Sequence, residues 1–232
     1  SLVIHINDNW VVFCLFSKTK LIDLNKVNFL HEKKSAFILK TIKKYLKSFS
    51  KKNTPIKVKL IYYNKSSALV PHYLFDDKNS LNYLKYNTRI QINDLAANDL
   101  ILEDQINNVY IPYTDINNYI FEKFKAFDFY HYSSVLLEKL SNELTDNFSQ
   151  KFFLNINNSF IDILYFKNKQ LIFFNSFDYK SKEDILYYLL FTFSELSLNP
   201  DNIHLVCCGL IDLDSELYLS LIHISEPTRR LN

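Results

Sequence analysis

Two short clusters of carboxylates are candidates for a chemical role in this sequence. Asp212, Asp214 and Glu216 lie close together near the end of the chain, and carboxylate oxygens at such spacing can bind a divalent cation. The same residues suit the first turn of a helix, where the helix dipole favours negative charge. Asp76 and Asp77 form a similar pair. We expect both clusters to begin helices, and we predict no metal site.

Histidine, cysteine and serine show no catalytic spacing. None of the six histidines is spaced like a pair of zinc ligands. Cys207 and Cys208 follow an apolar pair and are typical of a buried strand, and Ser133 and Ser134 lack the glycines of a nucleophile elbow. Asp162 lies between two apolar residues of an expected strand, so alternation predicts that it faces solvent. We therefore predict no catalytic residue and no cofactor. The histidines are His5, His31, His72, His131, His204 and His223.

One run of the chain is strongly basic, because residues 33–59 contain ten lysines and no acidic residue. Such a run can contact RNA or an anionic membrane surface, or it can be a solvated helix face. Lysine lacks the planar fork that favours arginine in nucleic-acid recognition. If RNA binds here, charge reversal at Lys43, Lys44 and Lys47 would abolish RNA retention. The lysines that share the expected polar helix face are Lys40, Lys43, Lys44 and Lys47.

Glycine is nearly absent, since Gly209 is the only one in 232 residues. Average usage would give about 16 glycines. A glycine-rich phosphate loop needs several positions where only Gly fits, so the composition argues against one. The 48% hydrophobic and 16% aromatic shares suffice for a packed core, and the net charge of +2 favours no class of partner. No apolar run reaches the roughly 18 residues of a membrane span. The three cysteines give no disulfide framework, so we expect a cytoplasmic protein.

A repeat relates two parts of the sequence. A shift of 150 residues aligns 3–22 (VIHINDNWVVFCLFSKTKLI) with 153–172 (FLNINNSFIDILYFKNKQLI) without a gap. Each copy is typical of three strands joined by a polar turn and then a Lys/Asn turn. Asn and Asp tolerate the left-handed backbone that hairpin turns often need, so they can replace Gly. Chance similarity of two β-meanders is the alternative to a duplication.

Apolar periodicity predicts alternating helices and strands after each meander. Asp115 and Ser181 are expected to cap helices, because their oxygens can accept hydrogen bonds from first-turn amides. This order predicts an α/β duplication, with a first half at 1–146 and a second half at 147–218. The expected helices are 32–50, 76–86, 115–125, 133–144 and 182–196, with one more from Asp214. The expected strands outside the meanders are 57–62, 99–104, 108–113, 127–132 and 203–208.

Several segments together resemble a bacterial family, domain-of-unknown-function family 3822. The resemblance covers about residues 2–218 and has no assigned activity. It implies the actin-like ATPase superfold of sugar kinases, Hsp70 and actin, with duplicated halves that each open with a three-strand β-meander. The segments that carry it are SALVPHYLFD (67–76) with 81–84, NNVYIPY (107–113), YHYSSVLLE (130–138), the meander at 153–172 and GLIDLDSELY (209–218).

The resemblance also implies where phosphate would bind, at the first hairpin turn of each half. ATPases of that superfold have an Asp there to hold hydrated Mg²⁺, and a Gly two residues later that lets backbone amides approach phosphate. In this chain His5 and Asn155 stand at the Asp positions, and Asn7 and Asn157 stand at the Gly positions. The other residues of these turns are Asp8, Asn158 and Ser159, and the nucleoside loop keeps only Gly209. We expect a pseudo-enzyme, with a divergent nucleotide binder as the alternative.

The end of the sequence departs from the rest. The stretch from Leu219 to Arg229 reads LSLIHISEPTR and resembles the translation of a sequencing-library adapter. Two of the three arginines in the chain are Arg229 and Arg230. We predict that the native part of this sequence extends only to about Tyr218 and that 219–232 is a non-native tail. An ordinary polar tail is the alternative.

These patterns lead to one functional hypothesis. The chain is expected to be a non-catalytic actin-like protein that serves as an interaction scaffold for a protein partner, through the cleft between its halves or an exposed edge of the first half. One alternative is a divergent nucleotide-binding ATPase or kinase-like protein. The other is an RNA-binding protein that uses the basic face between Lys33 and Lys59.

Overall fold

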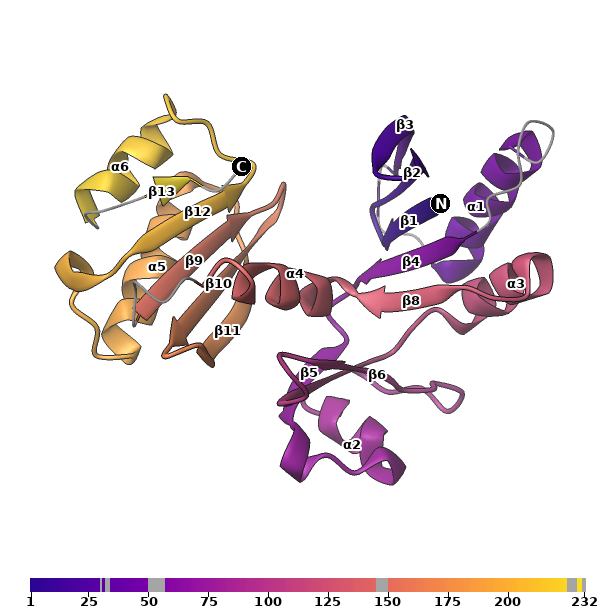
Figure 1. Cartoon of the computed structure of the whole chain (residues 1–232), viewed down its shortest axis with the longest axis horizontal. Coiled ribbons are helices and arrows are strands. Elements are labelled where there is room, and N and C mark those ends of the chain that lie inside the picture. The colour runs from indigo at the N-terminus through magenta and orange to yellow at the C-terminus, as the bar shows by residue number, and fades with distance from the viewer. Residues whose placement is uncertain (30, 32–33, 50–56, 145–149, 225–228, 231–232) are drawn as a thin grey trace. The chain divides into compact units, whose positions relative to one another are not determined.

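The computed structural model of the chain describes residues 1–29, 31, 34–49, 57–144, 150–224 and 229–230. By its contacts the chain forms two compact units, Ser1–Leu140 and Ser141–Asn232, called unit 1 and unit 2 below (Figure 1). Among the described residues, every helix is too short or too polar to cross a membrane.

Unit 1 is built on a five-stranded sheet. Strands β1 (Leu2–Asn7), β2 (Trp10–Ser17) and β3 (Lys20–Asn28) form an antiparallel meander. Strands β4 (Val58–Tyr63) and β8 (Asp128–His131) then run parallel to β1, which gives the order β3-β2-β1-β4-β8. A connection between parallel strands must cross over the sheet, and helices make these crossovers.

Helices α1 (Ser35–Phe49) and α3 (Thr114–Phe124) pack on one face of this sheet. Apolar residues at helical spacing put one stripe of α1 into the core, as the sequence predicts. Alternation along β1 buries Ile4 and Ile6 on the same face and leaves His5 on the other. The helical residues at the centre of this core are Ile38, Ile42, Leu46, Ile116 and Ile120.

A second, smaller sheet belongs to unit 1. Its strands β5 (Ser67–Pro71), β6 (Ala97–Ile101) and β7 (Ile106–Tyr110) are antiparallel in the order β5-β7-β6. The sequence patterns did not predict β5 as a strand. The predicted helix 76–86 is split into η2 (Asp77–Asn79) and α2 (Ser80–Leu84). The remaining elements are the short helix η1 (His72–Leu74) and α4 (Tyr132–Ser141).

The turn between β6 and β7 has an unusual backbone. Leu102, Glu103 and Asp104 all have positive φ, at 54°, 53° and 62°. Residues other than Gly, Asn and Asp seldom adopt this left-handed region, because the Cβ atom approaches the following carbonyl oxygen. The backbone N–H of Leu102 donates to Oε1 of Glu138 on α4 at 2.5 Å, which holds the start of the turn.

Unit 2 repeats the strand order of the larger sheet of unit 1. Strands β9 (Gln150–Ile156), β10 (Phe160–Lys167) and β11 (Gln170–Asp178) form an antiparallel meander. Strands β12 (Leu205–Gly209) and β13 (Arg229–Arg230) run parallel to β9 in the order β11-β10-β9-β12-β13. The helices are α5 (Lys182–Glu195), η3 (Pro200–Asn202) and α6 (Glu216–Ile224).

Both meanders contain an irregularity at corresponding places. The register between β2 and β3 shifts at Leu15/Phe16, and that between β10 and β11 shifts at Tyr165/Phe166. Left-handed residues occur in the second turn of each meander, at Lys18, Asn168 and Lys169. The Asn-rich first turns contain none among the described residues, so the expected replacement of Gly there by left-handed Asn is wrong.

The two predicted helix caps differ in outcome. Ser181 caps α5 as expected, in a capping box in which its hydroxyl accepts from the N–H of Asp184 and the Asp184 carboxylate accepts from the N–H of Ser181. Asp115 does not cap α3. The N-cap position is Tyr113, and Asp115 lies inside the first turn, where its carboxylate accepts from the N–H of Ile116. A carboxylate there still favours the positive end of the helix.

Candidate functional site

The first predicted phosphate turn follows β1, and its side chains are bonded within the protein. The amide Nδ2 of Asn7 donates to the backbone oxygen of Tyr63 at 2.9 Å, and its Oδ1 accepts from the N–H of Asn9 at 2.9 Å. The carboxylate of Asp8 accepts from the hydroxyl of Tyr113. Burial, together with the negative charge of Asp8, raises the pKa of Tyr113 well above its usual value. The turn is therefore held by hydrogen bonds within itself and to Tyr63 and Tyr113.

His5 lies one side-chain position before Asn7 on the same face of β1. Its Nδ1 is 3.3 Å from the hydroxyl of Tyr63, and burial lowers the pKa of the imidazole below 6.5. Tyr63 in turn stacks on Tyr132, with ring centroids 4.2 Å apart, and contacts the edge of Trp10 at 4.9 Å. At neutral pH the group in the position of the expected metal-holding Asp is thus an uncharged ring against aromatic side chains.

The second predicted turn, after β9, is organised by a residue that sequence reasoning placed wrongly. Asp162 on β10 is fully buried rather than exposed. Its Oδ2 accepts from Nδ2 of Asn155 at 2.8 Å and from Nδ2 of Asn157 at 3.2 Å, and its Oδ1 accepts from the hydroxyl of Ser176 at 2.6 Å. Asn155 and Ser176 are its partners across the strands on either side. A carboxylate therefore lies beside this turn, on the neighbouring strand.

Alternation failed for Asp162 because β10 is buried on both faces, with every residue from Ile161 to Phe166 buried. A strand covered on both sides shows no solvent face. The unbroken apolar run around Asp162 was the signal that could have revealed this. The other two turn residues, Asn158 and Ser159, are exposed.

Gly209 ends β12 directly against the second turn. It has φ of +83°, and a Cβ atom placed on it would lie 2.2 Å from the backbone oxygen of Ile156 and 2.9 Å from Oδ1 of Asn155. The next residue, Leu210, donates its N–H to that Ile156 oxygen at 2.7 Å. The structure thus brings Gly209, Asn155 and Ile156 together, and a side chain at position 209 cannot fit.

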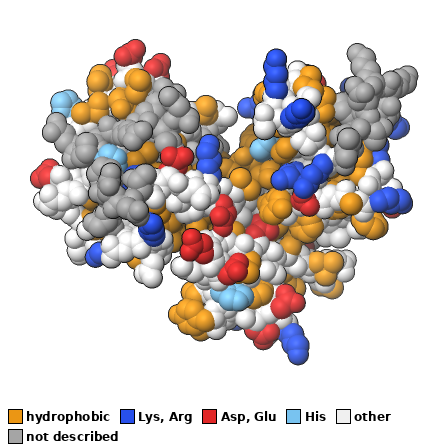
Figure 2. All heavy atoms as spheres, viewed as in Figure 1, with side chains coloured by type: hydrophobic (Ala, Val, Ile, Leu, Met, Phe, Trp, Pro, Cys, Tyr) orange, Lys and Arg blue, Asp and Glu red, His pale blue; other side chains and the backbone are white. Residues whose placement is uncertain are grey.

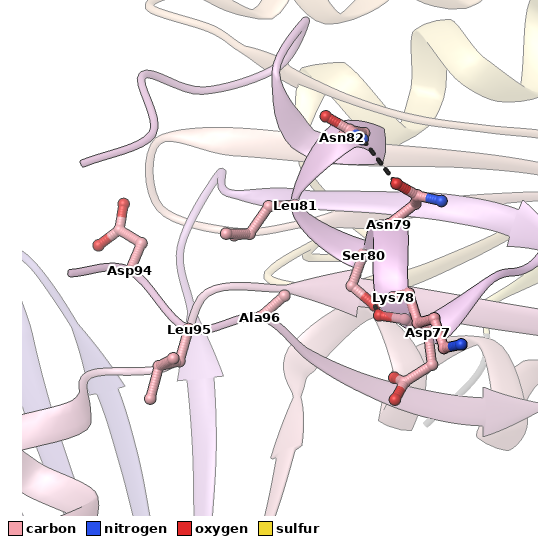
Figure 3. Close-up of a pocket in the computed structure, with 9 residues that line it drawn as sticks. All are labelled: Asp77, Lys78, Asn79, Ser80, Leu81, Asn82, Asp94, Leu95 and Ala96. Atoms are coloured by element: carbon pink, nitrogen blue, oxygen red, sulfur yellow. Dashed lines mark hydrogen bonds between the residues drawn. The ribbon is translucent and has the colours of Figure 1, made fainter. Parts of the chain in front are cut away.

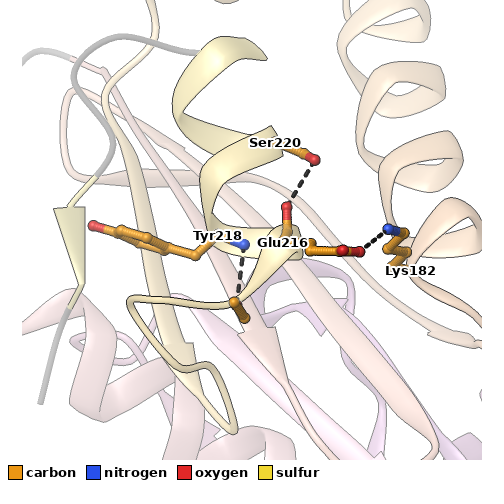
Figure 4. A network of polar contacts seen from close by, with 5 residues as sticks. Lys182, Glu216, Tyr218 and Ser220 are labelled. Carbon is orange, nitrogen blue, oxygen red and sulfur yellow. Dashed lines mark hydrogen bonds and ion pairs between the residues drawn. The ribbon is translucent and has the colours of Figure 1, made fainter.

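The carboxylates near the end of the chain begin a helix, as expected. Glu216 opens α6 and pairs with Lys182 at the start of α5 (Figure 4). Asp212 accepts from the N–H of Asp214 at 3.3 Å, which helps to form the preceding turn. Among the described residues, no group of three or more His, Cys, Asp or Glu side chains is arranged to hold a metal ion.

The lysines of the predicted basic face are exposed. Lys40, Lys43, Lys44 and Lys47 all project from α1, and Nζ of Lys43 lies over the ring of Tyr119 at 4.9 Å from its centroid. The structure thus brings these four together on one helix. Three further lysines of the run, Lys33, Lys51 and Lys52, lie outside the described residues.

A buried polar network, which the sequence patterns did not indicate, joins the two sheets of unit 1. Asp99 on β6 accepts from the N–H of His131 at 2.8 Å, from the hydroxyl of Ser134 at 2.5 Å and from the hydroxyl of Tyr110 at 3.0 Å. Burial raises the pKa of Asp99, and these hydrogen bonds oppose the rise. The members come from four separate elements, so no spacing along the chain could reveal them.

His131 in this network is buried and neutral. Its Nε2 lies 2.9 Å from the backbone oxygen of Asn64, which can only accept, so Nε2 carries the proton. Its Nδ1 is 2.7 Å from the hydroxyl of Ser133 and accepts from it. Burial lowers the pKa of His131 to about 4. These contacts give His131 a structural place in unit 1.

Among its described residues, unit 1 contains at least two hollows. One, of about 440 Å³, lies between the residues 77–82 and 94–96. Its polar side chains form hydrogen bonds with neighbouring residues of the same segment. The hydroxyl of Ser80 donates to the backbone oxygen of Asp77 at 2.7 Å, and Nδ2 of Asn82 donates to Oδ1 of Asn79 at 3.0 Å (Figure 3). The other, of about 620 Å³, lies between β6 and the sheet that holds β1, β4 and β8, and His5 and Asp99 both line it. The larger hollow is called the groove below.

Comparison with solved structures shows the same architecture. A protein from Bacteroides thetaiotaomicron VPI-5482, described as having an actin-like ATPase fold and unknown function, is 19% identical with a TM-score of 0.76. The match covers 100% of this chain and 90% of that one. A chain from a PilM–PilN type IV pilus biogenesis complex is 12% identical with a TM-score of 0.60, over 100% of this chain and 88% of that one.

No curated protein sequence is significantly similar to the chain. A family model described as "Protein of unknown function (DUF3822)" matches residues 1–223, almost the full length. The resemblance first noted in the segments between Ser67 and Tyr218 is therefore confirmed. With the α/β architecture and the structural neighbours above, the chain belongs to the DUF3822 family and has the actin-like ATPase fold.

Proposed function

We propose that this protein is a non-catalytic, actin-like pseudo-ATPase of the bacterial cytoplasm that serves as an interaction scaffold. One observation carries the proposal: the side chains at both predicted phosphate turns already make hydrogen bonds within the protein. Asn7 uses its amide donor and its acceptor, and Asp8 accepts from Tyr113. Asp162, the carboxylate nearest the second turn, is fully buried and accepts from three donors.

The chemistry of ATP hydrolysis needs the opposite arrangement. A carboxylate must reach a hydrated Mg²⁺, and backbone amides must approach the phosphates without a side chain in between. Releasing Asp162 to do so would break its hydrogen bonds with Asn155 and Asn157, and losing the acceptor of the buried Asn155 amide alone costs about 1–3 kcal/mol. The bonding at the turns therefore favours a structural role over metal binding.

A role as a scaffold is supported by the fold neighbours. One of them is part of a PilM–PilN type IV pilus biogenesis complex, so a protein of this fold assembles with another protein there. Unit 1 also has an exposed edge. Strand β3 ends its sheet, and Leu21, Ile22 and Leu24 on it are 44%, 60% and 56% exposed. Apolar residues on an edge strand are suited to contact a partner chain.

An ATP titration tests the non-catalytic part. The full chain is heated with Mg²⁺ alone and with Mg²⁺ and 1 mM ATP, and the midpoint of unfolding is compared. A Kd of 10 µM would stabilise the protein by about 2.7 kcal/mol, which corresponds to a shift of several degrees. We expect no shift and no heat of binding in calorimetry. Micromolar binding would overturn the proposal in favour of a divergent nucleotide binder.

A further inference from the structure

The groove of about 620 Å³ lies entirely within unit 1. One wall is formed by four consecutive residues of β6, from Asn98 to Ile101. Facing it are residues of β1, β4 and β8, and α4 adds Ser134, Val135 and Glu138. The hollow is therefore bounded by two different sheets and one helix.

A free strand edge borders this groove. Strand β6 is the last strand in the order β5-β7-β6 of the described residues, as β8 is in the larger sheet. Side chains alternate between the two faces of a strand, so four consecutive lining residues mean that the edge of β6, not one face, borders the groove. Such an edge offers unpaired N–H and C=O groups to an added strand.

The edge of β8 is less available than that of β6. The N–H of His131, at the end of β8, already donates to Asp99 at 2.8 Å. Asp99 therefore occupies one end of the groove and blocks pairing there. An incoming chain would find its backbone partners on β6.

Exposed apolar side chains converge on the groove from three elements. Leu100 on β6 is 44% exposed, Tyr130 on β8 is 37% exposed and Val135 on α4 is 42% exposed. Val3 and Ile61 line it as well. Large apolar residues exposed singly are common, but their convergence in one hollow is typical of a binding site.

The charge around the groove favours a basic ligand. Residues 66–111, which hold the smaller sheet, contain six acidic and three basic residues. Figure 2 shows acidic side chains gathered over this lower part of unit 1. In the groove itself Asp99 and Glu138 are acidic, and Nζ of Lys59 lies over the ring of Tyr130 at 5.9 Å. His5 is neutral there, because burial lowers its pKa.

We propose that this groove binds an extended segment of a partner protein, which pairs with the edge of β6, places apolar side chains against Leu100 and Val135, and carries a Lys or Arg toward Glu138. This inference rests on the proposed scaffold function and deepens it by naming the surface and the chemistry of the partner. Backbone pairing supplies affinity, and the apolar contacts and the basic residue supply specificity.

A library of random 12-residue peptides displayed on phage provides the probe. It is selected on the full 232-residue chain and counter-selected on the L100D/V135D variant. We expect selected peptides to alternate apolar residues and to contain Lys or Arg. In fluorescence anisotropy a synthetic copy should bind wild type at least ten times more tightly than the double variant. The matched control is Leu190→Asp on α5, since Leu190 is 44% exposed like Leu100 but lies outside the groove; it should bind like wild type.

Two further measurements separate strand addition from simple apolar binding. N-methylation of alternate peptide residues should abolish binding, because it removes the backbone donors. Glu138→Gln should weaken the Lys-bearing peptide several-fold and leave its norleucine analogue unchanged. If L100D/V135D does not give a normal unfolding transition, Tyr130→Ser replaces it.

Any of three results would contradict the proposed peptide binding in the groove. Peptides that bind wild type and the groove variant equally, that tolerate N-methylation, or that are never enriched would overturn the proposal. The ATP titration is run on the same preparation. Absence of peptide binding together with absence of ATP binding refutes the groove alone, whereas ATP binding refutes the non-catalytic function.

Discussion

Asn155 and Asp162 lie opposite each other on β9 and β10, with the amide Nδ2 of Asn155 2.8 Å from Oδ2 of Asp162. The resemblance to actin-like ATPases puts an Asp at position 155. In this chain the carboxylate stands on the next strand and is fully buried. The amide and the acid thus form a polar pair that joins β9 and β10 beside the turn where the resemblance implies a phosphate site.

Removing this acid should destabilise unit 2. Asp162→Ala removes the acceptor of the hydrogen bonds from Asn155, Asn157 and Ser176, and we expect a loss of about 3 kcal/mol in the free energy of unfolding. Urea unfolding followed by circular dichroism measures it. Asp214→Ala, at an exposed site, is the control and should change stability by less than about 0.5 kcal/mol. Equal effects of the two substitutions would contradict the structure.

Gly209 should not tolerate any side chain. Gly209→Ala forces a Cβ atom to 2.2 Å from the Ile156 oxygen in a backbone with φ of +83°, so β12 must move away from β9. We expect a loss of about 3 kcal/mol, or a drop of about 10 °C in the unfolding midpoint. Scanning calorimetry checks this. Ser159→Ala, exposed in the neighbouring turn, should unfold within a degree or two of wild type, and a similar midpoint for Gly209→Ala would be evidence against the close approach.

A glycine in the left-handed turn after β6 should raise the free energy of unfolding. Glu103 has φ of 53°, and Glu103→Gly removes the steric cost of that conformation, so we expect a gain of about 1 kcal/mol. Lys85→Gly is the control, because Lys85 has an ordinary φ of −58° and glycine there only adds freedom to the unfolded chain. The control should lose up to about 1 kcal/mol. Urea unfolding of both variants side by side makes the comparison, and a loss in both would show that the turn is not strained.

Buried His131 should make stability depend on pH. Its pKa is lowered to about 4 in the folded protein, against 6.5 for an unperturbed histidine, so the unfolded chain takes up a proton first as pH falls. Its contribution is complete above pH 6.5 and is lost progressively between pH 6.5 and about 4, by up to about 3 kcal/mol. Asp99, whose pKa is raised, gains a proton first in the folded state and offsets part of this loss at the acid end.

Nuclear magnetic resonance can check this assignment directly. The resonance of a ring proton of His131 should not shift between pH 7.5 and 5.5. Urea unfolding at several pH values should show the matching decline in stability. A midpoint for His131 near 6.5 would mean that the ring is hydrated and that the network around Asp99 is open.

Sequence periodicity predicted the large sheets and their helices because their burial follows simple patterns. Ile38, Ile42 and Leu46 recur at helical spacing and are fully buried in the core of unit 1. The two meanders were found because their polar turns and apolar strands recur 150 residues apart. Local patterns of this kind need no knowledge of distant parts of the chain.

Long-range polar contacts were beyond such reasoning. Asp99 contacts His131, which is 32 positions away in the sequence, and neither has a pattern around it that indicates the other. The groove needs β6 and β8 to be brought together, and β5 in the same sheet was not predicted as a strand at all. The position of Asp162 was predicted wrongly because alternation assumes one solvent-facing side, which β10 does not have.

Because both meanders have the same register shift, their hairpin tips can be exchanged with each other. In each, one extra isoleucine, Ile22 or Ile172, lies between paired positions, and both are exposed. Segments 16–22 and 166–172 have equal length and enter and leave their strands in the same phase. Exchanging them would therefore leave every cross-strand neighbour outside the tips unchanged. The residues of either hairpin tip could thus be replaced, which changes the side chains exposed there, without altering the strand pairing of the sheet.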